Sequence, residues 1–141
     1  MSSPADIIYQ VLLDSGIVEE SGKWVAYVSF LPDAPDDAVC IYDTAGRLDG
    51  RVMVTGEQVV HPGVQIRVRG LSYVEVWEKA NEIAKGLDGL AKVSVALSSS
   101  EAYTLINVSR TGDIIPVGIE EENGRRRHHF TINAVVTLEK E

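Results

Sequence analysis

The stretch VQIRVRGLSYVEVWEKA, residues 64–80, decides most of the fold because its hydrophobic period changes partway along. From 64 to 69, apolar residues alternate with polar ones, which is typical of a strand with one buried face. Gly70 ends the alternation, and apolar side chains then recur at helical spacing. Ser72, with Glu75 three residues later, forms a capping box that marks a helix start. We therefore predict a strand over 64–69 and a helix over 73–87.

The predicted helix has a wide apolar side and an acidic side. The apolar side contains Tyr73, Val76, Trp77, Ala80, Ile83, Ala84 and Leu87. The acidic side contains Glu75, Glu78 and Glu82. On the strand before it, Arg67 and Arg69 share the polar face, which we expect to point to solvent. Exposed ion pairs are typically worth under about 1 kcal/mol, so we expect these arginines to add little to the stability of a single chain.

The flanking segments complete an α+β domain. Ser3, Pro4 and an apolar stripe from Ile7 to Leu12 predict a helix near the start of the chain. Further strands are predicted over 23–31, 38–42, 93–97, 102–108, 114–119 and 129–138, with a turn at 43–46. The fold class is then a mixed, mainly antiparallel sheet with two helices packed on one face. Residues 1–141 form one domain, with a projecting hairpin or loop arm at about 47–61.

Composition narrows the classes of function. The formal net charge of −8 argues against nucleic-acid binding unless the basic residues cluster. The single cysteine, Cys40, lies in a predicted strand and excludes an internal disulfide. The sequence shows no signal peptide, and no apolar run reaches the roughly 20 residues that span a bilayer. We expect a protein of the reducing cytoplasm without a membrane partner.

One charge block stands out near the end of the chain. Glu120, Glu121 and Glu122 are followed, across an Asn-Gly turn signal, by Arg125, Arg126 and Arg127 and two histidines. Two interpretations stay open: a solvated hairpin tip, or complementary pairing between subunits. His128 and His129 are expected on opposite strand faces, so the pair cannot chelate one ion.

No catalytic signature is present. The glycine spacings do not form a nucleotide loop, and no serine or cysteine has a sequence-level base partner. The loop LPDAPDD contains Asp33, Asp36 and Asp37, which could hold a cation, but aspartate beside proline is also ordinary turn chemistry. We predict that the protein is not an enzyme and needs no cofactor.

The two arginines on one strand face suit carboxylates of another chain, because a guanidinium can bond a carboxylate through two parallel N–H groups. The acidic side of the helix offers such carboxylates in Glu75, Glu78 and Glu82. We therefore predict subunit contacts through Arg67, Arg69, these glutamates and Arg125, Arg126 and Arg127. A head-to-tail ring would use two different surfaces of each copy in this way.

At this point a family resemblance becomes visible. HPGVQIRVRGLSYVEVWEKANEIAKGL, residues 61–87, resembles the centre of the tail terminator proteins of long-tailed bacteriophages, some of them labelled minor capsid proteins. IYDTAG at 41–46 resembles the family's strand before its variable arm, and GRRRHHFTINAVVTLE at 124–139 its closing strand. The matching positions are Pro62, 64–69, Tyr73, Ala80, Ile83, Arg127, Phe130 and Asn133. The run of three arginines and two histidines is denser than the family pattern.

The resemblance implies a structural virion protein at the neck of the tail, made in the host bacterial cytoplasm. Such proteins form a hexameric ring that caps the tail tube, ends its growth and joins it to the head connector or stopper protein. DNA passes through the ring without specific binding. Two other functions stay open: a small-ligand regulatory module with a pocket lined by Arg67 and Arg69, or a metal-dependent hydrolase using the aspartate loop.

Overall fold

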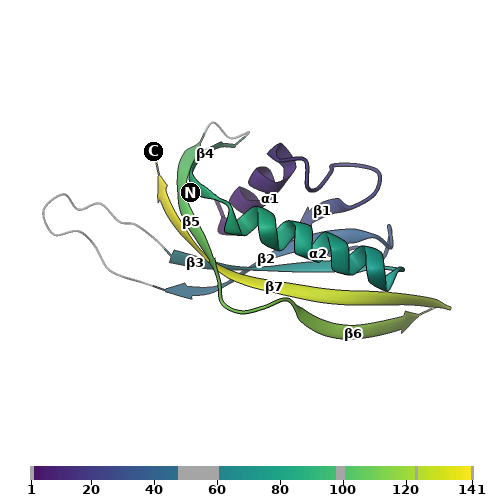
Figure 1. Cartoon of the computed structure of the whole chain (residues 1–141). Coiled ribbons are helices and arrows are strands. Elements are labelled where there is room, and N and C mark those ends of the chain that lie inside the picture. Colours follow the sequence, from purple (N-terminus) through teal and green to yellow (C-terminus); the bar gives the residue numbers. More distant parts are fainter. Residues whose placement is uncertain (1, 48–60, 98–100, 123, 141) are drawn as a thin grey trace, which may run out of the picture.

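Two helices cover one face of a seven-stranded sheet in the computed structural model of the protein (Figure 1). The structure describes residues 2–47, 61–97, 101–122 and 124–140. The predicted α+β class is confirmed: most strand pairs are antiparallel, and a single pair within those ranges is parallel. The predicted arm lies outside the described residues, apart from its ends at 47 and 61, which belong to paired strands.

The elements follow the order α1, β1, β2, β3, α2, β4, β5, β6, β7. Their bounds are Pro4–Asp14 for α1, Val25–Val28 for β1, Ala38–Arg47 for β2, His61–Gly70 for β3, Tyr73–Asp88 for α2, Ala91–Ala96 for β4, Ala102–Arg110 for β5, Ile115–Glu122 for β6 and Arg125–Lys140 for β7. The sheet order is β1-β2-β3-β7-β5-β4, and β6 also pairs with β7. The long strand β7 therefore carries β3 on one edge and both β5 and β6 on the other.

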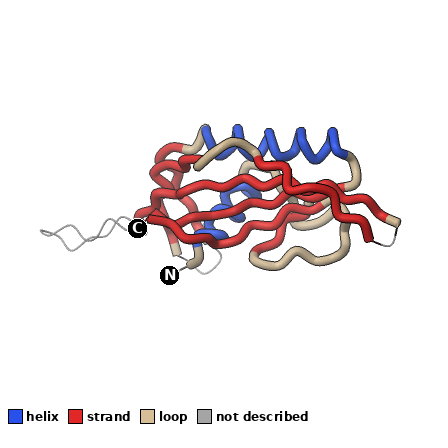
Figure 2. The backbone as a smooth tube through the Cα atoms, turned by 90° about the horizontal axis from the view of Figure 1, so that it is seen from below, coloured by secondary structure: helices blue, strands red, loops and turns tan. Residues whose placement is uncertain are grey.

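Strand register separates an apolar face from a polar one. Ile66 pairs with Ile41 on β2 and with Ile132 on β7, and all three side chains are buried in the core under the helices. Arg67 and Arg69 alternate with these residues and lie on the opposite face. Seen from below, the strands lie in front of part of the helical layer (Figure 2). The face that carries no helix is called the open face from here on.

Both helices begin where the sequence predicts. Ser3 caps α1 and Ser72 caps α2, each accepting a hydrogen bond from a backbone N–H in the first turn. Val76, Ala80, Ile83, Ala84 and Leu87 of α2 are buried, as expected. Tyr73 and Trp77 were predicted on the same buried side, but they are 56% and 40% exposed. Their rings contact the buried ring of Phe130 on β7, and the rest of each ring stays open to solvent.

Two predicted boundaries are wrong for local reasons. The predicted strand at 23–31 shrinks to β1, because Trp24 and Ser29 have φ values of 60° and 66°, which extended backbone does not allow. The predicted turn at 43–46 is instead a continuation of β2. Asp43 accepts a hydrogen bond from the backbone N–H of Ala5 at 2.9 Å, so it joins the first turn of α1 to the sheet rather than forming a turn.

Candidate functional site

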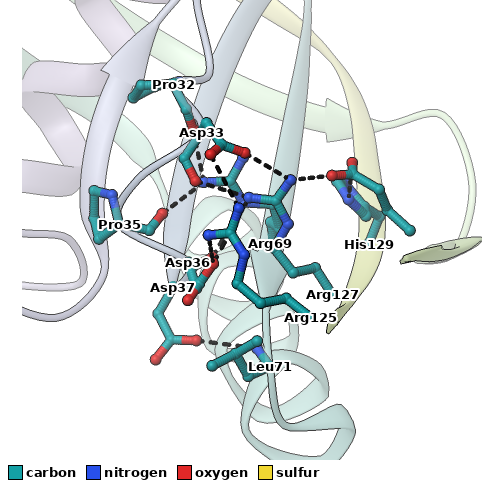
Figure 3. A network of polar contacts seen from close by, with 11 residues as sticks. Pro32, Asp33, Pro35, Asp36, Asp37, Arg69, Leu71, Arg125, Arg127 and His129 are labelled. Carbon is teal, nitrogen blue, oxygen red and sulfur yellow. Dashed lines mark hydrogen bonds and ion pairs between the residues drawn. The ribbon is translucent and has the colours of Figure 1, made fainter. Parts of the chain in front are cut away.

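Arginines, acids and one histidine gather on the open face where β3, β6 and β7 meet the loop between β1 and β2 (Figure 3). We call this group the arginine cluster. It consists of Arg69, Arg125, Arg127, His129, Glu120, Asp33 and Asp36. Adjacent pairing of β3 with β7, and of β7 with β6, places the side chains of alternate residues on the same face. The cluster therefore ties a loop from the first quarter of the chain to the final hairpin.

Arg69 is the central residue of this cluster and is only 3% exposed. Its Nε donates to the carbonyl oxygen of Asp36 at 3.1 Å, and its Nη2 donates to those of Pro32 at 2.8 Å and Pro35 at 2.5 Å. The expectation that Arg69 faces solvent is wrong, because the loop folds over the open face and encloses it. Its guanidinium supplies hydrogen bonds to backbone carbonyls that have turned inward. Arg69 is therefore part of the fold of the single chain.

Arg125 and Arg127 hold the same loop through its aspartates. Arg125 donates to Asp36 Oδ1 at 2.8 Å and to Asp33 Oδ2 at 3.0 Å. Arg127 is 2% exposed, bonds the carbonyl oxygen of Asp33 at 2.8 Å, and forms an ion pair with Glu120 across the β6–β7 pair. The hydrogen bond from Arg125 lowers the pKa of Asp33, and the one from Arg127 lowers the pKa of Glu120. Both carboxylates therefore already have arginine partners within the chain.

Two acids of the charge block pair with two of its arginines across the β6–β7 hairpin. Glu120 lies opposite Arg127, and Glu121 lies opposite Arg126 in the register of β6 and β7. The Arg126–Glu121 pair is exposed, with 75% and 62% of the two side chains accessible, at an N–O distance of 2.5 Å. Gly124 in the connecting turn has a φ of 78°, as the turn signal predicts. An intersubunit role for Arg125, Arg126 and Arg127 stays a prediction.

His128 and His129 face opposite sides of the sheet, as predicted. His128 packs edge-on against the ring of Tyr73 on the helical side. His129 is buried on the open face, and its Nε2 lies 3.1 Å from Glu120 Oε2. Burial lowers the pKa of His129 below its ordinary value of 6.5, and the nearby positive charges of Arg67 and Arg69 act in the same direction, although Glu120 opposes them. Neutral imidazole is therefore the form that the folded protein prefers.

This lowered pKa predicts a pH-dependent stability. Below pH 6.5 the unfolded chain protonates this histidine more readily than the folded protein does. The free energy of unfolding should therefore fall as the pH falls from 6.5 toward the folded pKa, by at most about 1.4 kcal/mol per pH unit from one group. Urea unfolding at pH 7.5 and at pH 5.5 should show a smaller loss for His129→Gln than for the wild type. Equal losses in the two proteins would contradict the assignment.

Arg67 differs from the other arginines of the open face. It is half-buried and lines a pocket of about 220 Å³ together with Val117, Gly118, Ile119, Glu120 and His129. Among the described residues, no carboxylate lies within ion-pair distance of its guanidinium. Arg69 does not line this pocket, so the structure does not place the two predicted arginines around it.

The three predicted glutamates lie on α2, on the other side of the sheet. Glu75 pairs with Lys23 at 3.0 Å, and Glu82 pairs with Lys79 at 2.9 Å. Glu78 is exposed and has no ion pair within the described ranges. Lys23 and Lys79 each lie 5.8 Å from the centre of the Trp24 ring, in a groove of about 260 Å³ that Glu78 also lines. The structure therefore does not bring the predicted arginines and helix acids together within one chain.

The aspartate loop has a structural role that the sequence did not reveal. Asp33 and Asp36 bind arginines, and Asp37 accepts a hydrogen bond from the backbone N–H of Leu71 at 3.2 Å. No group of three or more His, Cys, Asp or Glu side chains suited to a metal ion occurs in the described part of the chain. Glu120 and His129 were also missed as members of the cluster. The sequence did hold a signal for Glu120, because a run of acids before the hairpin turn and a run of arginines after it can pair across the two strands.

The chain is a small α+β domain with a buried arginine cluster on one face and an acidic helix on the other. The model of the bacteriophage tail terminator protein family matches residues 8–138, so the chain belongs to that family. A search of curated proteins found no match. Membership of this family places the protein in the virion tail. Separately, none of the described helices has the length and apolar character needed to cross a membrane.

Proposed function

We propose that this protein caps the tail tube of a bacteriophage as a ring of six copies. The ring ends the growth of the tube and joins the tail to the head connector or stopper protein. The observation that carries the proposal is the family match over residues 8–138, which covers most of α1, all of α2 and nearly the whole sheet. The function requires no catalysis and no cofactor, and the copies are made in the cytoplasm of the host bacterium.

The charge of the chain supports this proposal. A net charge of −8 per copy would surround a central channel with negative charge. DNA is itself strongly negative, so it would pass through such a channel without binding specifically. The tail tube protein and the connector would then contact the two ends of the ring, while neighbouring copies contact each other at its sides.

In this proposal, the subunit interface uses only those predicted residues whose side chains are accessible in a single chain. These are Arg67, Glu75, Glu78, Glu82, Arg125 and Arg126. Arg69 and Arg127 are buried, so in this proposal they act from beneath the surface by holding the loop and the hairpin in place. A ring in which one surface contacts a different surface of the next copy fits this distribution on two faces of the sheet.

Tube growth tests the proposal directly. Purified tail tube protein should polymerise until the terminator is added, and then stop at one end. Electron microscopy should show tubes of restricted length with extra density at that end. A matched sample without the terminator should contain longer tubes with bare ends. Continued growth with no end-bound protein would refute the function.

A further inference from the structure

Arg67 brings a further positive charge to the edge of the arginine cluster. Within the cluster, the three positive charges of Arg69, Arg125 and Arg127 are matched by three negative charges on Asp33, Asp36 and Glu120. The three other arginines are occupied by these carboxylates and by loop carbonyls. The Nε of Arg67 is shielded from solvent and has no hydrogen-bond partner among the described residues. A charged donor beside an open pocket is suited to bind a carboxylate of another molecule through a charge-assisted hydrogen bond.

Glu78 is the counterpart on the helical side. Its neighbours Glu75 and Glu82 already have lysine partners, whereas Glu78 has none within the described ranges. Residues 74 and 78 lie one turn apart on α2, so Glu78 adjoins the exposed side chain of Val74, and Trp77 next to it is also exposed. The surface around Glu78 therefore combines one free carboxylate with exposed apolar side chains.

The two groups cannot meet inside one molecule. Ile66 and Val68, on either side of Arg67, are fully buried in the core that α2 covers, so Arg67 points to the other face of the sheet. Glu78 is an exposed residue of α2, the helix that lies above that core (Figure 1). The sheet separates them, so each is available only to a second molecule.

We infer that Arg67 of one copy binds Glu78 of the next copy, with the exposed Val117 beside the pocket packing against Val74 and Trp77. The contact joins two different faces, so it repeats head to tail and closes into a ring when the rotation permits. The inference rests on the proposed function and identifies the residue pair in the interface. It reduces the predicted set of arginines and glutamates to one pair, because the structure assigns partners to the others.

Charge reversal tests the pairing. Arg67→Glu alone and Glu78→Arg alone each place like charges across every contact, and each should weaken assembly by at least about 30-fold. An equimolar mixture restores an opposite-charge pair at every contact of an alternating ring. Sedimentation velocity should therefore show that the mixture assembles at concentrations where either variant alone stays monomeric.

Glu82→Arg is the matched control, because it makes the same charge change one helical turn away at a residue that already pairs with Lys79. Alone, Glu82→Arg keeps Arg67 and Glu78, so it should assemble as the wild type does, whereas Glu78→Arg should not. Equal losses of assembly in Glu82→Arg and Glu78→Arg, or no rescue of Arg67→Glu by Glu78→Arg, would overturn the pairing. Thermal melting shows first that each variant is folded. If Arg67→Glu does not fold, Arg67→Gln and Glu78→Gln should each weaken assembly, and the double variant should be no weaker than either one. Additive losses would overturn the pairing.

The same variants on tail tubes separate this inference from the proposed function. If the wild type ends tube growth but the mixture does not, the pairing is wrong and the function stands. If the wild type neither assembles nor ends tube growth, the proposed function fails, and the pairing fails with it. If the wild type assembles in solution and the mixture is rescued but tubes keep growing, the pairing stands and the function fails.

Discussion

Arg69→Ala should lower the free energy of unfolding of the isolated chain by about 3 kcal/mol or more. The arginine is enclosed by the loop between β1 and β2 and donates hydrogen bonds to three of its carbonyl groups. Removing the guanidinium leaves these acceptors without their partner, and each buried group left so costs about 1 to 3 kcal/mol. Partial opening of the loop to water would recover some of this cost. Urea unfolding of dilute protein at neutral pH measures the difference.

Arg67→Ala is the control for this prediction, since it removes the same side chain from the same strand face. Arg67 has no carboxylate partner among the described residues, so its loss should change the free energy of unfolding by less than about 1 kcal/mol. If the two variants lose the same stability, the distinction drawn between these arginines is wrong. A loss below about 1 kcal/mol for Arg69→Ala would contradict its structural role.

Arg127→Ala should have the second-largest effect, about 2 to 4 kcal/mol. Arg127 is nearly fully buried and joins the loop, through Asp33, to Glu120 on β6. Removing one member of a buried ion pair is strongly destabilising because the other charge loses its partner, although Glu120 is 40% exposed and water will offset part of the loss. Thermal and urea unfolding of the isolated chain both report this effect.

Arg126→Ala provides the comparison one residue away in the same strand. The Arg126–Glu121 pair is exposed, so its removal should cost less than about 1 kcal/mol. Both arginines face a glutamate across the β6–β7 register, so the expected difference comes from the burial of Arg127 and its contacts with the loop at Asp33. Similar losses in both would show that Arg127 is not a buried anchor.

Local signals predicted the elements well. The change from alternation to helical spacing after Gly70, and the cap at Ser72, placed β3 and α2 within a few residues of their observed bounds. These signals depend on neighbours in sequence. The turn predicted at 43–46 failed because Asp43 bonds a backbone N–H in α1, 38 positions earlier in the chain. Propensity cannot report a partner that only the tertiary fold supplies.

Burial of polar residues was the main feature that the sequence did not predict. Alternation shows which face Arg69 occupies but not what covers that face, and here a loop from residues 32–37 does so. The opposite error occurs for Tyr73 and Trp77, whose spacing predicts burial, although both rings stay largely exposed beside Phe130. The predicted interface set therefore mixed residues needed for folding with residues open to a partner.

The central claim is that this chain forms the terminating ring of a phage tail. Electron cryomicroscopy of purified tails, with a reconstruction of the end that meets the head, tests it most directly. The account predicts a closed ring of six copies on the last layer of the tube, with the open face of each copy against α2 of the next. Absence of this chain from that end, or a ring with another number of copies, would contradict the claim.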